Sequence, residues 1–107
     1  VGGVMHCFSG DLAFAYAAIE LNFFLAFGGV LTFRSAQALQ AIAQEIDTAH
    51  LLLETDSPWL APVPHRGQRN EPAYLPKVLN QLALLKQAEP EDIAQITTEN
   101  ARHLFRF

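Results

Sequence analysis

The run from residue 51 to residue 60, Leu-Leu-Leu-Glu-Thr-Asp-Ser-Pro-Trp-Leu, constrains the fold more than any other part of the chain. Three consecutive leucines followed by polar residues and a proline indicate a buried strand of a parallel sheet that opens into a loop. Side chains alternate along a strand, so Glu54 and Asp56 point to the same face. A barrel strand is buried on both faces, and an acidic pair there is costly unless it meets a metal, an arginine or hydrogen-bond donors. The run therefore indicates a site, although a turn-capping Asp56 and a Glu54 paired with Arg66 or Arg69 explain the strand equally well.

Strand-like and helix-like segments alternate along the chain. Strands are expected at residues 1–8, 22–27 and 51–54, and helices at 12–21, 36–45, 73–87 and 90–104. Asp11 or Ser9 is expected to cap the first helix and Ser35 the second, while Pro76 and Pro90 suit the first turns of the last two. Alternation with right-handed crossovers predicts a parallel sheet with helices packed outside it.

The number of strands limits how complete this fold can be. A (β/α)8 barrel needs about 250 residues, and the chain has 107, with no initiator methionine. We therefore expect residues 1–107 to form the C-terminal three β/α units of a (β/α)8 TIM barrel, an incomplete barrel whose other strands lie upstream of Val1. Such a piece has two sheet edges with unpaired backbone groups, so it should self-associate or dock on its N-terminal half.

Charge and composition exclude several broad classes of protein. Seven basic and eleven acidic residues give a net charge of −4, so a phosphate-containing partner would need a local basic cluster or metal ions. The single cysteine excludes an internal disulfide framework, and a cytoplasmic location is expected. No apolar run reaches the roughly 18 residues of a membrane helix, so no membrane partner is expected.

Residues 56 to 71 form a long segment rich in proline, arginine and glycine, which is typical of a functional loop. Arg66 and Arg69 can grip a phosphate backbone through paired hydrogen bonds, or pair with a nearby carboxylate, and the second role is favoured for at least one of them. Asn70 is expected to cap the next helix or brace the loop. Trp59 could stack on a nucleobase, but packing beneath the loop is favoured.

Ligand sites of parallel sheets lie at the carboxyl ends of the strands. His6, Gly28, Gly29 and the residues that follow the third strand should therefore lie together, with the two glycines leaving room above the second strand. Imidazole and carboxylate groups at strand ends are ligands for zinc, manganese or magnesium. A lone histidine on a strand is, however, more often a core or rim residue. His6 is thus a candidate ligand on the inner face, whereas Cys7 is expected on the outward face as a small buried hydrophobe.

Four segments resemble the TatD family of metal-dependent hydrolases. Residues 5–10 read Met-His-Cys-Phe-Ser-Gly, and residues 54–62 read Glu-Thr-Asp-Ser-Pro-Trp-Leu-Ala-Pro. Residues 66–72 read Arg-Gly-Gln-Arg-Asn-Glu-Pro, and residues 98–105 read Thr-Glu-Asn-Ala-Arg-His-Leu-Phe, similar to the family's last helix. The spacing and order match over essentially the whole chain, which makes the resemblance more specific than any single motif.

The resemblance implies a TIM-barrel enzyme of the amidohydrolase type that cleaves DNA phosphodiester bonds with one or two divalent metals, Mg, Mn or Zn. His6 matches the metal-ligand histidine of the His-Cys-Phe motif. Asp56 matches an aspartate that binds metal and orients or deprotonates the attacking water. Arg66 and Arg69 are candidate substrate-binding residues, with Glu54 and Asn70 in supporting roles.

Several ligands of the family are missing from these 107 residues: an N-terminal His-x-His pair, a glutamate and a further histidine. We therefore expect the chain alone to be inactive. The expected partner of the complete enzyme is single-stranded DNA or a DNA end. The alternatives are hydrolysis of another ester, a lactone or an amide, or a non-catalytic truncated piece.

Overall fold

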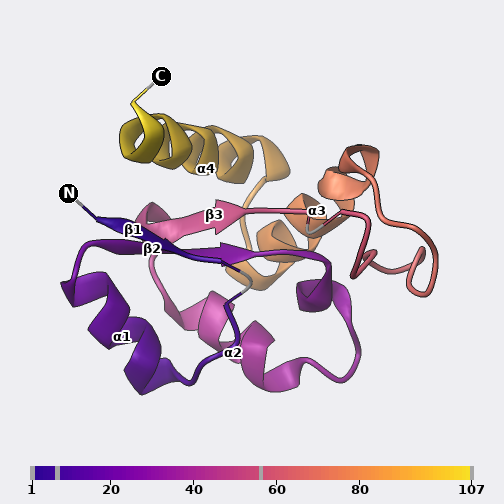
Figure 1. Ribbon diagram of the computed structural model, residues 1–107, viewed down its shortest axis with the longest axis horizontal. Coiled ribbons are helices and arrows are strands. Elements are labelled where there is room, and N and C mark those ends of the chain that lie inside the picture. The colour runs from indigo at the N-terminus through magenta and orange to yellow at the C-terminus, as the bar shows by residue number, and fades with distance from the viewer. Residues whose placement is uncertain (1, 7, 56, 107) are drawn as a thin grey trace.

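A computed structural model describes residues 2–6, 8–55 and 57–106 of the chain (Figure 1). The strands are β1 (Gly3–Met5), β2 (Phe23–Phe27) and β3 (Leu51–Leu53), and the α-helices are α1 (Leu12–Glu20), α2 (Gln37–Glu45), α3 (Leu75–Lys86) and α4 (Pro90–Phe105). Three short 3-10 helices, Gly29–Thr32, Thr48–His50 and Pro72–Tyr74, connect them. None of the helices in the described part of the chain is both long and apolar enough to cross a membrane.

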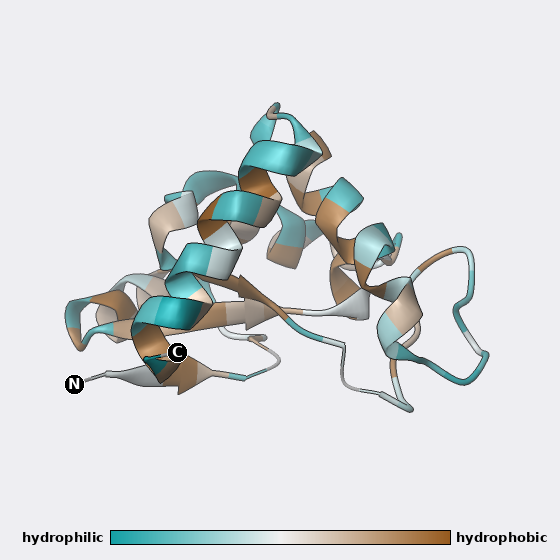
Figure 2. Ribbon diagram, turned by 90° about the horizontal axis from the view of Figure 1, so that it is seen from above, coloured by the Kyte–Doolittle hydropathy of each residue, from teal (hydrophilic) through white to brown (hydrophobic). Residues whose placement is uncertain are grey.

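The three strands form one parallel sheet in the order β1-β2-β3. Val4 is paired with Phe24, and Ala26 with Leu52. Because paired residues of a parallel sheet share a face, these four residues lie on one face, which we call the open face. Figure 2 shows the helices gathered on the other side of the sheet. The arrangement is that of three consecutive β/α units, as predicted.

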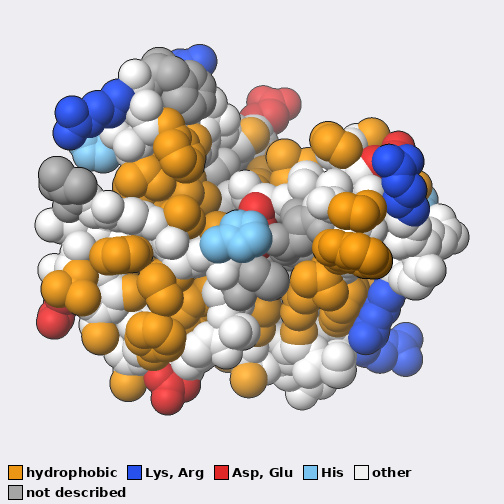
Figure 3. Space-filling view, in the orientation of Figure 1, with side chains coloured by type: hydrophobic (Ala, Val, Ile, Leu, Met, Phe, Trp, Pro, Cys, Tyr) orange, Lys and Arg blue, Asp and Glu red, His pale blue; other side chains and the backbone are white. Residues whose placement is uncertain are grey.

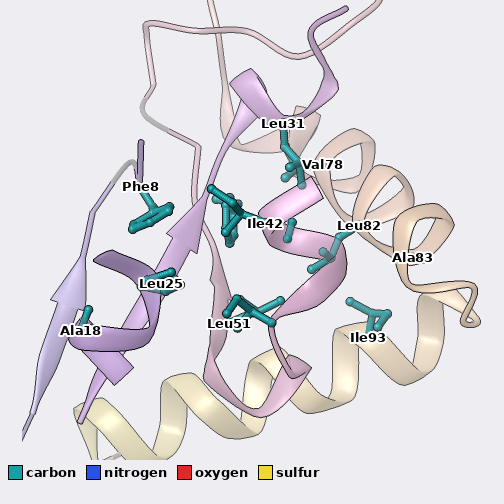
Figure 4. Close-up of a cluster of buried hydrophobic side chains, with 14 residues drawn as sticks. Phe8, Ala18, Leu25, Leu31, Ile42, Leu51, Val78, Leu82, Ala83 and Ile93 are labelled. Carbon is teal, nitrogen blue, oxygen red and sulfur yellow. The ribbon is translucent and has the colours of Figure 1, made fainter. Parts of the chain in front are cut away.

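The core lies between the sheet and the helices. Leu25, Phe27 and Leu51 from the strands pack there against Ile42 of α2 and Leu82 of α3, and all five are buried. Figure 4 shows Leu25 and Leu51 from the strands meeting Ile42 and Leu82 from the helices in one cluster. Each buried leucine or isoleucine contributes about 2 kcal/mol through removal of apolar surface from water. Alternate residues of the strands therefore form the face of the sheet that the helices cover.

Local signals explain most of the helix ends. The Asp11 side chain accepts a hydrogen bond from the Phe14 amide and caps α1, while Pro76 and Pro90 lie in the first turns of α3 and α4. The predicted cap at Ser35 is wrong, because Ala36 occupies the cap position of α2 without a side-chain hydrogen bond. The Gln40 side chain instead bonds to the Leu31 and Phe33 carbonyl oxygens, joining α2 to the turn after β2.

Candidate functional site

His6 and Glu54 meet at the carboxyl end of the sheet. The His6 Nε2 atom lies 3.3 Å from the Glu54 Oε1 atom. The histidine side chain is 69% exposed and the glutamate side chain 11% exposed. Near the centre of the face drawn in Figure 3, a histidine touches an acidic side chain between two groups of hydrophobic side chains. An imidazole at the surface is thus held against a nearly buried carboxylate.

The fold explains why these two side chains meet although β2 separates their strands. His6 continues the alternation of β1 and shares the face of Val4, while Glu54 continues that of Leu52. The Glu54 amide donates to the Phe27 carbonyl oxygen, which extends the ladder by one bond beyond β3. Towards this end of the sheet, the residue that β2 presents on the same face is the small Ala26. A small residue at that position lets the longer side chains approach each other.

The chemistry of these two donors fits a divalent metal, since imidazole and carboxylate are ligands that zinc and manganese accept. Two ligands are too few to complete a metal site. Within residues 2–6, 8–55 and 57–106, no group of three histidine, cysteine, aspartate or glutamate side chains is positioned to hold an ion. Asp56, the predicted catalytic and metal-binding residue, and Cys7 lie outside the described residues. Their roles stay predictions.

Asn70 holds the loop together from a buried position, with 2% exposure. Its side-chain amide donates to the carbonyl oxygens of Thr55 and Trp59, the latter at 2.8 Å. Its Oδ1 atom accepts from the Glu71 amide, and its own backbone amide donates to the Pro58 carbonyl oxygen. Of the two roles expected for Asn70, the structure shows bracing of the loop, directly beside the segment that leaves β3.

The loop also packs tightly on the turn after β2, and the expected room above Gly28 and Gly29 is absent. A Cβ atom at Gly29 would collide with the Leu60 carbonyl oxygen and would lie 2.9 Å from the Pro62 amide nitrogen. The Thr32 hydroxyl accepts from the Val63 amide and donates to the Gly29 carbonyl oxygen. Glycine is therefore needed here for close backbone approach, not for an open cavity.

Arg66 and Arg69 do not take the carboxylate partners considered above. Glu54 contacts His6 instead, and neither arginine joins an ion pair with another described residue. The Arg66 guanidinium lies over the Phe33 ring, with its Cζ atom 3.9 Å from the ring centroid. Trp59 is 72% exposed, so the favoured prediction that it packs beneath the loop is wrong.

Two contacts made by Phe33 and Asn100 did not follow from the sequence. Phe33 ends a short turn and became notable only through its contact with Arg66. The Asn100 side-chain amide of α4 donates to the carbonyl oxygens of Thr48 and Leu51, both at 2.9 Å, and so fixes α4 against the start of β3. Neither contact follows from periodicity, because each joins segments far apart in the sequence.

Comparisons with known proteins agree with this architecture. The family model for TatD related DNase matches residues 1–106. The chain belongs to the TatD family. It is 50% identical over 106 residues to the uncharacterized metal-dependent hydrolase YabD of Bacillus subtilis, covering 99% of this chain and 42% of that protein. It is 46% identical over 104 residues to the uncharacterized metal-dependent hydrolase YcfH of Escherichia coli K12, covering 97% and 39%.

Solved structures extend the comparison to the fold. YJJV, a TatD homolog from Escherichia coli K12, matches with a TM-score of 0.91 and 32% identity over 98% of this chain and 40% of its own. A TatD family hydrolase from Entamoeba histolytica shares the fold at 17% identity, with a TM-score of 0.84 over 94% of this chain and 41% of its own. This TatD chain therefore spans about two fifths of the length of its relatives. Its fold is that of three β/α units of a TIM barrel, as predicted.

Proposed function

We propose that this TatD chain is the C-terminal part of a metal-dependent hydrolase that cleaves phosphodiester bonds of DNA. The observation that carries the proposal is the contact between His6 and Glu54 at the carboxyl end of the sheet, the end at which barrel enzymes place their catalytic groups. Support also comes from the match to the TatD related DNase model and from relatives named as metal-dependent hydrolases.

In this proposal His6 and Asp56 would hold a divalent metal, and Glu54 would orient the His6 ring. A carboxylate beside a ligating histidine fixes its tautomer and raises its basicity, and the 3.3 Å contact between His6 and Glu54 supports this role for Glu54. A bound divalent ion supplies a water of lowered pKa and stabilises charge on a phosphoryl oxygen. Asp56 accepts the proton from the attacking water in the proposed mechanism.

The remaining ligands would come from the part of the barrel that the relatives possess beyond the length matched here. The proposed domain is thus a longer barrel of which residues 1–107 supply the C-terminal portion. His6 and Asp56 are two ligands, fewer than the three protein ligands of an open catalytic zinc site. We therefore propose that the chain alone is inactive and that it acts after joining or docking on its N-terminal half.

The test is hydrolysis of an end-labelled single-stranded oligonucleotide by the chain alone and by the chain extended to the length of its relatives. Only the extended protein should cleave, with Mg, Mn or Zn supplied and chelator as the metal-free control. Asp56→Asn and His6→Asn should each lower the rate by about 100-fold or more, because each removes a proposed ligand. His103→Asn on α4 and Asp92→Asn are matched substitutions that should leave the rate unchanged.

Two results would contradict the proposal. Cleavage by the 107 residues alone, lost in Asp56→Asn, would mean that they assemble a complete site. Metal-dependent hydrolysis of a lactone, amide or simple ester by the extended protein, with no cleavage of DNA, would assign the site to another substrate class.

A further inference from the structure

A hollow on the surface of the loop is lined by none of the residues proposed above to bind the metal or to activate water. It has a volume of about 650 Å³, and Phe33, Trp59, Arg66 and Arg69 are among the residues that line it. We call it the arginine–tryptophan pocket. Its walls come from two segments, the end of the turn after β2 and the loop after β3. Asn70 braces the loop, and the Thr32 hydroxyl of the turn accepts from the Val63 amide of the loop, so the pocket is built into the fold.

Trp59 is the first notable feature of the pocket. Its side chain is 72% exposed, although full burial of a large apolar side chain is worth about 2 to 3 kcal/mol. The Trp59 carbonyl oxygen is held by Asn70 at 2.8 Å, so the backbone beneath the exposed indole is anchored. An exposed aromatic ring on an anchored backbone is suited to stacking against a planar ligand.

The two arginines are the second feature. Phe33 occupies one face of the Arg66 guanidinium at 3.9 Å, which leaves the N–H groups along the guanidinium edge to bind an anion. No described carboxylate lies within 4.0 Å of the guanidinium nitrogens of Arg66 or Arg69. In a chain with net charge −4, two such cations in one hollow form a local positive site.

We propose that the arginine–tryptophan pocket binds an unpaired nucleotide of single-stranded DNA, with the base on Trp59 and its phosphate at Arg66 and Arg69. The choice of DNA as the polymer rests on the proposed function. Trp59 follows Glu54 by five residues, and an extended chain spans at most about 3.5 Å per residue. Their Cα atoms thus lie within about 17 Å, so one oligonucleotide can reach both the pocket and the His6–Glu54 contact.

The chemistry of the pocket favours a nucleotide over an acidic peptide. A peptide carboxylate would use the arginines and leave Trp59 exposed, whereas a nucleotide supplies both an anion and an aromatic plane. Duplex DNA supplies the anion, but its bases are already stacked on one another and cannot reach Trp59 without unpairing. The pocket therefore selects single strands or frayed ends, and it does so without a metal.

Trp59 is the one tryptophan of the chain, so its fluorescence reports on the pocket directly. We expect a short single-stranded oligonucleotide to quench the emission of the 107-residue chain in the presence of EDTA. A blunt duplex of the same sequence should quench it at least about 10-fold more weakly, as stacking on a base accounts for a factor of that size. A poly-glutamate peptide at equal charge serves as the acidic-peptide probe.

Substitutions separate the contribution of base stacking on Trp59 from that of phosphate binding by the two arginines. Binding is measured by the anisotropy of a labelled oligonucleotide. Trp59→Leu should weaken single-strand binding about 10-fold and leave its salt dependence unchanged. Arg66→Gln with Arg69→Gln should weaken binding and lower the slope of log K against log salt by about 1 to 2. Leu84→Ala, at a residue 73% exposed on α3, and Arg102→Gln with Arg106→Gln are controls that should change neither quantity.

Equal quenching by single-stranded and duplex DNA would overturn the inference, and so would equal quenching by poly-glutamate. Binding unaffected by Trp59→Leu would also overturn it. The outcome is independent of the hydrolysis assay. DNA cleavage by the extended protein without quenching would support the proposed function and contradict only the binding role of the pocket. Metal-free quenching without cleavage would support binding in the pocket and contradict the proposed function.

Discussion

At the scale of single residues, the loop that carries Trp59 is positioned by contacts that leave no space for change. Gly29 faces the Leu60 carbonyl oxygen and the Pro62 amide nitrogen, both backbone atoms that cannot rotate aside. Leu60 itself has a φ of 57°, a left-handed conformation that bulky residues rarely adopt. Tight packing and local strain thus coincide where the loop crosses the turn after β2.

We predict that Gly29→Ala lowers the free energy of unfolding by about 2 kcal/mol or more, because the new methyl group displaces backbone atoms of the loop. Gly67→Ala is the contrast. No atom lies within 4 Å of a Cβ there, but its φ is +89°, so the cost is limited to the left-handed conformation, about 1 kcal/mol. Urea unfolding measures the change in the free energy of unfolding for both variants. A Gly29→Ala protein as stable as the Gly67→Ala protein would contradict the packing described here.

At the scale of elements, Lys86 links the end of α3 to the end of α2, beyond the apolar packing between the two helices. The Lys86 Nζ atom donates to the carbonyl oxygens of Gln44, at 3.0 Å, and Ile46. These groups lack helical partners because α2 ends at Glu45. Burial lowers the pKa of Lys86, while the nearby Asp47 and Glu45 act in the opposite direction.

We predict that Lys86→Met lowers the free energy of unfolding by about 1 kcal/mol at neutral pH through the lost hydrogen bonds. With a lowered pKa in the folded state, the unfolded chain binds more protons between that pKa and the usual value of 10.5. The stability difference between the native chain and Lys86→Met should therefore grow as the pH rises through that window. Unfolding curves at several pH values test whether this stability difference grows with pH. Lys77→Met, at an exposed lysine of α3, is the control.

Helix and strand positions followed well from the sequence, and the exceptions have physical causes. The first strand was expected to reach Phe8, but β1 ends at Met5, and Phe8 turns into the helix-side core at 4% exposure. Alternation along an extended strand would instead put Phe8 on the same face as His6. The three 3-10 helices were not anticipated, since such short turns lack a periodic apolar pattern.

At the scale of the whole molecule, the helices gather on one side of the sheet (Figure 2), and on the open face Val4 and Phe24 are only half-buried. Parallel sheets are normally covered on both faces. In addition, β1 and β3 each have one edge that pairs with no other described strand. A half-buried apolar face and unpaired edges are surfaces through which chains associate.

We predict that the 107-residue chain self-associates or binds its N-terminal half through the open face. Phe24→Glu places a charge on that face and should shift the sedimentation profile towards the monomer, because burying an unpaired carboxylate is costly. Leu84→Glu adds the same charge at an exposed site on α3 and should leave the profile unchanged. A native chain that is monomeric at every concentration tested would contradict the prediction.

The sequence by itself determined the order of strands and helices, the membership of the TatD family and the candidate status of His6. These depend on local periodicity and on motifs whose residues are close in the chain. Only the tertiary structure decided which side chains meet. Glu54 contacts His6 and not an arginine, Arg66 stacks on Phe33, and Trp59 is exposed rather than packed. Such contacts join residues on different strands and loops, and their choice depends on how strand ends and loop backbones pack in space.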